Sequence, residues 1–188
     1  MNKKIFALLS FIIIICIAFI SYSRVYTIMD NEIQLKDNII QFLNRPTVIV
    51  NKIDIKQELN LDNKKYILFI FNNTCGEAEL TKGLTNKYKI ESIRYGSSST
   101  YFNDEIYKTN KGKYLIMTGE NPDMKIIYAR VTLDNKEYKI SIPHQEYFIS
   151  YCAIPIDTQL VYPSFNNTKL YNKNDADITD KISKVLFK

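Results

Sequence analysis

His144 is the only histidine in the chain, and it lies eight residues before Cys152 in the segment IPHQEYFISYC. A histidine and a cysteine held close together could form the base and nucleophile of a catalytic pair. If the segment is an extended strand, however, steps of about 3.3 Å per residue separate the two by roughly 26 Å. Cys75 is the remaining candidate partner for His144, but no third residue that would orient the histidine can be named. We therefore predict no catalytic residues and a protein that is not an enzyme.

Whether the cysteines can form a disulfide depends on where they lie. Cys16 falls within an apolar N-terminal segment, whereas Cys75 and Cys152 follow or end predicted strands. On the outer side of a membrane, where oxidation is possible, Cys75 and Cys152 could form a disulfide. Two separately buried thiols are the alternative, and the sequence leaves both open.

Metal and cofactor chemistry has little support in the sequence. One histidine excludes the histidine-rich zinc patterns, and the two cysteines outside the apolar segment are far apart. The segment NKNDAD offers oxygen ligands for calcium but lacks the loop glycine and the final glutamate of an EF-hand. The carboxylates of Asp104 and Glu105 are adjacent, so on an extended strand they point to opposite faces. We predict no metal and no cofactor.

The charge pattern also excludes a class of partner. The formal net charge is +5, but basic and acidic residues are interleaved, as in LDNKEYK, and no run of five basic residues occurs. A solvated surface of mixed charge is typical of this pattern. We therefore expect no nucleic-acid partner.

The segment from 124 to 143 predicts a β-hairpin. Asp134 and Asn135 would form a two-residue loop that places Val131 opposite Tyr138. The alternation makes one face of the hairpin apolar and the other polar, as expected of a sheet with one side in water.

The polar face of this hairpin is the candidate binding surface. It carries Tyr128, Arg130 and Lys139, and the chain as a whole has 14 tyrosines. Aromatic rings beside cations on an open sheet can bind a sugar or a peptide. We predict that these three side chains contribute to binding.

The N-terminal segment, MNKKIFALLSFIIIICIAFISYSR, is the strongest signal in the sequence. Its apolar run covers residues 5–22, and roughly 18 residues with a rise of 1.5 Å each give about 27 Å. That length is close to the hydrocarbon thickness of a bilayer. The run has no polar face, which a core helix would carry, so we predict contact with the lipid bilayer through residues 5–22.

The flanking charges predict the orientation of this segment. Lys3 and Lys4 outweigh Arg24, so the positive-inside rule places the N-terminus in the cytoplasm and the remaining chain outside. We predict residues 1–23 to be a transmembrane signal-anchor of a single-pass membrane protein. Cleavage near Ser23, followed by secretion, is the alternative.

Residues 24–45 are predicted to be an amphipathic juxtamembrane helix. It ends where Arg45 precedes Pro46, because a residue before proline is displaced from helical geometry. Four apolar residues fall at heptad spacing: Met29, Ile33, Ile40 and Leu43. This stripe would pack on the following domain or pair with a second chain in a short stalk.

An apolar anchor leading into an amphipathic helix and then a sheet resembles the layout of type IV pilin-like proteins. The resemblance implies a filament or assembly subunit. Those proteins carry a small residue at a processing site and a glutamate early in the apolar helix, whereas no Glu lies between Met1 and Ile28 in this chain.

Residues 46–188 are predicted to form an extracytoplasmic β-rich domain. YILFIF (66–71) has the continuous apolar character of a central strand, and KYKIESIRY, YFNDEIYKT, KYLIMT and EYFISYCAI follow between turn-forming segments. Strands spaced this closely predict a mainly β (α+β overall) fold with an antiparallel sandwich or half-barrel.

Two further elements are predicted in this domain. Residues 77–83 fit either a strand or a capped helix, and we favour the strand. Near the C-terminus one helical stripe is formed by Ile178, Ile182, Val185 and Leu186, which predicts a short helix.

Taken together, these features predict a membrane-anchored extracytoplasmic domain with a non-catalytic binding or structural role at the cell envelope. The expected partner is an envelope protein or polymer. An exported enzyme of unknown reaction and a pilin-like filament or assembly subunit are the alternatives.

Overall fold

The computed structural model describes residues 3–45, 49–96, 101–159, 163 and 167–186. It contains a long N-terminal helix, antiparallel sheets and a short C-terminal helix, so the predicted mainly β (α+β) class is confirmed. The elements are α1 (Lys3–Val25), α2 (Glu32–Leu43), β1 (Asp54–Leu61), β2 (Lys64–Phe71), β3 (Thr74–Lys82), β4 (Tyr88–Tyr95), β5 (Phe102–Lys108), β6 (Lys113–Glu120), the 3-10 helix η1 (Pro122–Met124), β7 (Tyr128–Leu133), β8 (Lys136–Ser141), β9 (Tyr147–Ile154), β10 (Thr168–Tyr171) and α3 (Thr179–Leu186).

The strands of the described residues form three antiparallel sheets. Sheet A has the order β1-β2-β3-β4, sheet B has β5-β6-β9, and sheet C has β10-β7-β8. Most strands pair with the next strand along the chain, because short turns connect them. β9 and β10 are the exceptions, since each pairs with a strand that is not its neighbour in sequence.

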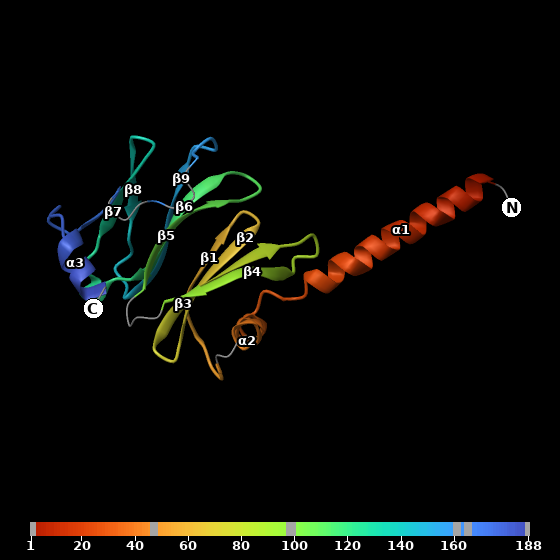
Figure 1. Ribbon diagram of the computed structural model, residues 1–188, viewed down its shortest axis with the longest axis horizontal. Helices are drawn as coiled ribbons and strands as arrows, with labels where there is room; N and C mark the ends of the chain where they lie inside the picture. Colours follow the sequence, from red (N-terminus) through yellow and green to blue (C-terminus); the bar gives the residue numbers. More distant parts are fainter. Residues whose placement is uncertain (1–2, 46–48, 97–100, 160–162, 164–166, 187–188) are drawn as a thin grey trace.

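Sheet B lies between sheets A and C (Figure 1). On its central strand β6, Ile116 packs with sheet A residues such as Leu68. The neighbouring residues Leu115 and Met117 pack with residues of sheet C, such as Val131. Because successive strand residues alternate between faces, one strand contributes to both cores. The predicted sandwich therefore has three layers of sheet.

Asparagine and aspartate form the tight turns. The β2–β3 turn has φ values of 46° at Asn72 and 59° at Asn73, and the predicted turn at Asp134 and Asn135 has 47° and 60°. Positive φ at both central residues is the geometry of a type I′ hairpin, which these residue types tolerate without glycine. The predicted hairpin register is confirmed, with Val131 opposite Tyr138 and six residue pairs in all.

The remaining predicted elements are found in the β-rich part. Residues 77–82 lie in β3, which pairs with β2 on one side and β4 on the other, so the strand interpretation is confirmed. The C-terminal helix is α3, and Ile178 and Ile182 are buried in the core between sheets B and C. The side chains of the other two predicted stripe residues lie outside the described part of the chain.

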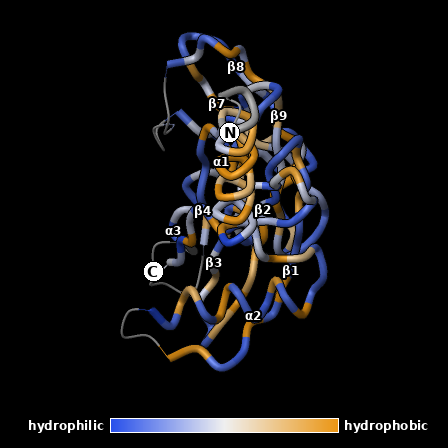
Figure 2. Tube along the Cα trace, turned by 90° about the vertical axis from the view of Figure 1, so that its right-hand side faces the viewer, coloured by the Kyte–Doolittle hydropathy of each residue, from blue (hydrophilic) through white to orange (hydrophobic). Residues whose placement is uncertain are grey.

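α1 extends away from the β-rich part (Figure 1). Figure 2 views it end-on and shows a predominantly hydrophobic helix, and none of its residues from Ala7 to Val25 is buried. This stretch of 19 residues is long and apolar enough to span a membrane or to act as a signal sequence.

The structure corrects the prediction of a single helix over residues 24–45. α1 continues to Val25, the chain then leaves helical conformation, and α2 begins at Glu32 after Asn31, whose side chain accepts a hydrogen bond from the Gln34 amide. That cap fixes the start of α2. Between the helices, Ile28 forms a β-bridge with Tyr88.

The buried face of α2 also differs from the predicted heptad stripe. The side chains that pack on sheet A are Leu35, Ile39 and Leu43, at a spacing of four residues. Of the predicted stripe, Leu43 is buried and Ile40 is partly buried, but Ile33 is 73% exposed and Met29 is 48% exposed. The new start of the helix at Glu32 leaves Ile33 in the first turn, facing solvent.

A buried lysine ties the segment between α1 and α2 to sheet A. Lys65 in β2 is 2% exposed, and its Nζ lies 2.7 Å from Asp30 Oδ1 and 2.6 Å from Glu58 Oε2. The same nitrogen lies 5.7 Å from the centre of the Tyr88 ring, and Tyr88 exchanges two backbone hydrogen bonds with Ile28. A charge buried in this way needs its partners, so residues 28–30 are held firmly against the sheet.

Candidate functional site

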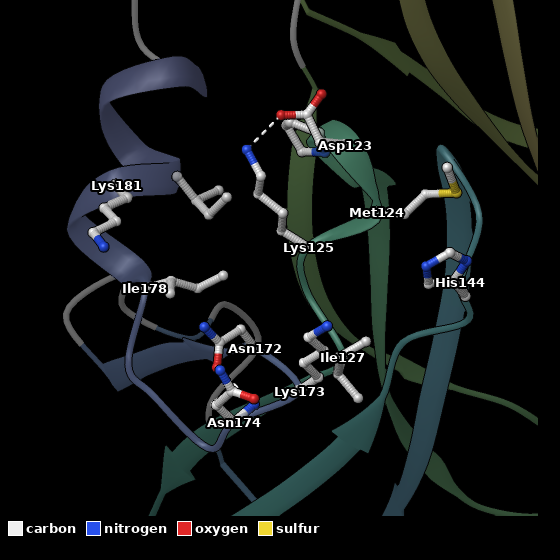
Figure 3. A pocket seen from close by; sticks show the side chains of 12 residues that line it. Asp123, Met124, Lys125, Ile127, His144, Asn172, Lys173, Asn174, Ile178 and Lys181 are labelled. Atoms are coloured by element: carbon white, nitrogen blue, oxygen red, sulfur yellow. Dashed lines mark hydrogen bonds and ion pairs between the residues drawn. The ribbon is translucent and has the colours of Figure 1, made fainter.

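A pocket of about 750 Å³ opens at the end of the molecule that carries α3 (Figure 3). Segments that are far apart in the sequence line it: residues 122–125 and Ile127 around η1, His144 in the β8–β9 turn, and residues between 172 and 182, from the β10–α3 turn into α3. Its volume lies within the usual range for small-molecule sites, about 300–1,000 Å³.

One wall of the pocket is apolar. Ile178, just before α3, and Ile182 within α3 belong to the core between sheets B and C. Ile127 is half-buried, and the exposed side chain of Met124 lies across the opening from α3 in Figure 3. The pocket therefore begins where the apolar core meets solvent.

The polar lining is mainly cationic. Lys125 forms an ion pair of 2.5 Å with Asp123, whereas Lys173 and Lys181 have no ion pair with any residue that the structure describes. Figure 3 shows Lys173 pointing into the space between α3 and His144, with Lys181 on the outer side of α3. The pocket thus offers an uncompensated positive charge beside an apolar wall.

The backbone on one side of the pocket is held in a strained conformation. Asp123 and Met124 have left-handed φ values of 55° and 54°. Aspartate tolerates this region but methionine rarely adopts it, so the strain falls on Met124. Asn121, which is fully buried, stabilises this turn because its amide donates to the Ile126 carbonyl at 2.9 Å and accepts from the Ile126 N–H at 2.8 Å. Strain of this kind is often found at binding sites.

The predicted binding surface lies elsewhere, on the outer face of sheet C. Arg130 Cζ is 5.7 Å and Lys139 Nζ is 3.9 Å from the centre of the Tyr128 ring, so the structure brings the three predicted residues together. The Tyr171 ring stacks on Tyr128 at 4.8 Å, with an interplanar angle of 8°.

The Tyr128 ring is nevertheless covered by these neighbours. Its exposed fraction is 5%, and its hydroxyl donates to Asp175 Oδ1 at 3.1 Å. Because the chain's own cations already occupy the ring face, this surface presents Arg130 and Lys139 to solvent rather than an aromatic platform. Whether it binds a ligand stays a prediction.

His144 and the cysteines do not meet. His144 is exposed at the pocket, Cys75 is buried between sheets A and B, and Cys152 packs against the core between sheets B and C. All three cysteines are free thiols, so the structure has the two separate thiols and not the disulfide between Cys75 and Cys152. Burial raises the pKa of Cys75 to about 12 and that of Cys152 to about 11. Thiols that stay protonated are poor nucleophiles.

The predicted strand that contains Cys152 explains this separation. Tyr147 and Ile149 face sheet A, and Phe148 and Cys152 face sheet C, because successive residues of an extended strand alternate between its faces. Cys75 lies on the sheet A side, so sheet B stands between the two sulfur atoms.

The described side chains do not form a cluster suited to a metal ion. Across the described ranges, no group of three or more His, Cys, Asp or Glu side chains is placed to hold a metal ion. In the NKNDAD segment, Asn172 Oδ1 accepts hydrogen bonds from the backbone amides of Asn174 and Ala176. This oxygen therefore stabilises a turn.

A buried polar network between sheets A and B was not predicted. Glu77 Oε1 accepts hydrogen bonds from Asn103 at 2.9 Å and from the Tyr107 hydroxyl at 3.1 Å, and Oε2 accepts from Thr118. Arg94 lies 3.4 Å from Glu77 and also forms an ion pair with Glu105. Glu77 is 7% and Glu105 is 5% exposed. Both carboxylates are buried although the Arg94 side chain is 34% exposed, so we assign the network to the stability of the A–B interface.

Asp104 and Glu105 point to opposite faces of β5, as predicted. Glu105 joins the network with Arg94, whereas Asp104 accepts a hydrogen bond of 2.8 Å from the Thr168 hydroxyl of β10. Burial raises the pKa of the Asp104 carboxyl above its usual 3.8, and the Thr168 hydrogen bond offsets only part of this effect.

Replacing Asp104 with asparagine is expected to raise the free energy of unfolding at neutral pH. A raised pKa means that the folded state binds the proton more tightly than the unfolded state does. The buried carboxylate therefore lowers the free energy of unfolding. This loss is absent below the unfolded-state pKa and complete above the folded-state pKa. The increase in the free energy of unfolding caused by Asp104→Asn should therefore grow as the pH rises from the unfolded-state pKa to the folded-state pKa of Asp104. Urea unfolding of both chains at a series of pH values measures it, with Asp37→Asn on the exposed face of α2 as control. A gain that does not depend on pH would contradict the assignment.

Comparison of the chain with protein-family models, with curated proteins and with solved structures found no match.

Proposed function

We propose that the protein is a non-catalytic binding protein of the cell envelope, anchored in the membrane by α1 with its β-rich part outside the cell. The length and composition of the Ala7–Val25 stretch support the anchor. The excess of lysine before this stretch supports a cytoplasmic N-terminus.

Contacts of the last turn of α1 favour retention of the anchor over cleavage near Ser23. The Tyr22 ring stacks on Tyr26 at 4.5 Å, and its hydroxyl accepts a hydrogen bond from the Leu84 amide in the β3–β4 loop. Cleavage at Ser23 would remove Tyr22 and both contacts.

The observation that carries the binding role is the pocket beside α3. An apolar wall next to the ammonium group of Lys173, which has no ion pair with a described residue, suits a ligand with an anionic group attached to an apolar body. The backbone around η1 is already fixed by Asn121, so little of the turn must be ordered on binding.

The two alternative functions have less support. A Cys/His enzyme would need Cys75 or Cys152 beside His144, but the thiols are buried in other parts of the fold. A pilin-like subunit would use a continuous helix from the membrane into the sheet, whereas the chain between α1 and α2 is extended.

Replacing Lys173 with glutamate is expected to weaken the binding of hexyl phosphate at least about tenfold, because a charge-assisted hydrogen bond contributes about 1.5–3 kcal/mol. Isothermal titration calorimetry of the full chain in neutral lipid nanodiscs measures the affinity. Inorganic phosphate, which lacks the apolar body, and hexanol, which lacks the charge, should bind more weakly than hexyl phosphate.

Lys136→Glu is the matched control, since Lys136 is an exposed lysine in the β7–β8 hairpin, outside the pocket. It should leave the affinity unchanged. No detectable binding of hexyl phosphate, or equal affinities of the Lys173→Glu and unmodified chains, would exclude the pocket as the site.

A further inference from the structure

We propose that the β3–β4 loop inserts the side chain of Leu84 into the interfacial layer of the bilayer that α1 spans, with Lys82 and Lys87 against anionic lipid head groups. This inference rests on the proposed membrane anchoring by α1. It adds a second contact with lipid, made by the β-rich part itself.

The end of α1 sets the position of the interface. The stretch Ala7–Val25 has 19 residues, which at 1.5 Å each give about 28 Å, close to the hydrocarbon thickness of about 30 Å. The last turn of α1 therefore lies at the outer boundary of the hydrocarbon. Tyr22 lies in this turn and Tyr26 follows it, and tyrosine is enriched at this depth of membrane proteins.

The β3–β4 loop is fixed to that same turn of α1. The backbone N–H of Leu84 donates to the Tyr22 hydroxyl, and Lys89 Nζ lies 5.6 Å from the centre of the Tyr26 ring. At Gly83, an added Cβ would lie 2.7 Å from Tyr26 ring atoms, so the absence of a side chain permits this close approach. Figure 1 shows the loop beside the end of α1. Leu84 must therefore lie at the depth of the interface.

The side chain of Leu84 has little contact with the rest of the protein. It is 90% exposed, the largest exposed fraction among the large hydrophobic residues that the structure describes. The loop that carries it is closed, because the Gly83 amide donates to the Lys87 carbonyl at 2.8 Å. An apolar side chain at the tip of an ordered turn is stabilised when lipid replaces the water around it.

The charges of the loop suit an anionic surface. Lys82 and Lys87 are exposed, and no acidic residue lies between Lys82 and Ile90. Lys89 is paired with Glu91 at 3.0 Å and contributes less net charge. Lysines that flank an inserted apolar residue are attracted to anionic head groups.

The absence of tryptophan from the chain allows a direct test. The full chain is reconstituted in phosphatidylcholine vesicles with and without phosphatidylglycerol, as three variants that each carry one tryptophan. Leu84→Trp reports on the loop and Phe11→Trp on the middle of α1. Ile156→Trp is the matched control, because Ile156 is an exposed apolar residue in the loop after β9. Emission wavelength and quenching by nitroxide-labelled lipids are measured for each.

We expect Phe11→Trp to be quenched best by nitroxides deep in the bilayer. Leu84→Trp should be quenched best by nitroxides near the head groups, and its emission should be shifted to the blue of Ile156→Trp. If Leu84→Trp behaves like Ile156→Trp while Phe11→Trp is quenched, the loop does not contact lipid although the anchor is correct. If Phe11→Trp is not quenched, the anchoring itself is wrong and the inference fails with it.

The role of the lysines is tested in the Leu84→Trp background. Phosphatidylglycerol should increase the quenching of this variant by nitroxides near the head groups, and replacing Lys82 and Lys87 with glutamine should abolish the increase. An increase that persists in the triple variant would overturn the assignment of anionic head groups to these two lysines.

Discussion

Replacing Glu77 with alanine is expected to lower the free energy of unfolding of the β-rich part by about 3–5 kcal/mol. The change removes the acceptor for Asn103, Tyr107 and Thr118, and the last two of these donors are buried. Buried donors without an acceptor lose their full hydration energy, at about 1–3 kcal/mol each. Urea unfolding of the full chain in detergent, followed by the near-ultraviolet signal of its tyrosines, measures the loss.

Two further variants separate the network from a general effect of losing a glutamate. Glu77→Gln keeps the size of the side chain and one carbonyl oxygen, so its loss should be smaller than that of alanine. Glu137→Ala removes an exposed carboxylate from β8 and should change the stability by no more than about 0.5 kcal/mol. A loss in Glu77→Ala no greater than in Glu137→Ala would mean that the network does not stabilise the A–B interface.

Replacing Ile39 with alanine is expected to cost about 2–5 kcal/mol, because Ile39 is fully buried between α2 and sheet A. The smaller side chain leaves a cavity that neighbouring residues fill only in part. The loss can be followed by urea unfolding, and faster hydrogen exchange of the α2 amides should accompany it.

Ile33→Ala is the matched control for this prediction, since it is the same substitution on the same helix at a residue that is 73% exposed. It should change the stability by no more than about 0.5 kcal/mol. The heptad stripe predicted from the sequence required Ile33 to be the buried residue. A larger loss in Ile33→Ala than in Ile39→Ala would therefore restore that stripe and contradict the structure.

Local patterns predicted the individual strands well. The alternation in β7, β8 and β9, and the Asp134–Asn135 turn, depend on neighbouring residues, so the faces and the register could be read from the sequence. The continuous apolar segment of β2 likewise indicated a strand paired on both sides.

Features that depend on distant contacts could not be predicted in this way. The sequence placed Cys75 and Cys152 at or after the ends of predicted strands, but it did not reveal that sheet B lies between them. The face of α2 depends on the cap at Asn31 and on the bridge between Ile28 and Tyr88, which lies far along the chain. The spacing of apolar residues along the helix does not predict the contact between Ile28 and Tyr88.

The pocket and the buried network were missed for a similar reason. His144, Lys173 and the turn at Asp123 come from separate loops, and only the stacking of the sheets brings them to one end of the molecule. Glu77 alternates with apolar neighbours as a solvent-facing residue would, and its burial follows from the sheet that packs over it. The NPD sequence before Met124 signalled a turn, but not its left-handed conformation.

The ion pairs of Lys65 limit how far the β-rich part can move relative to the end of α1. Asp30 is ion-paired with Lys65 of sheet A, and Ile28 is bridged to Tyr88 of the same sheet. Only a few residues therefore separate the end of α1 from the β-rich part. In a chain anchored by α1, the pocket beside α3 lies at the opposite end of the molecule (Figure 1). A ligand would then approach from the aqueous side, and the pocket would keep a nearly constant height and direction relative to the lipid surface.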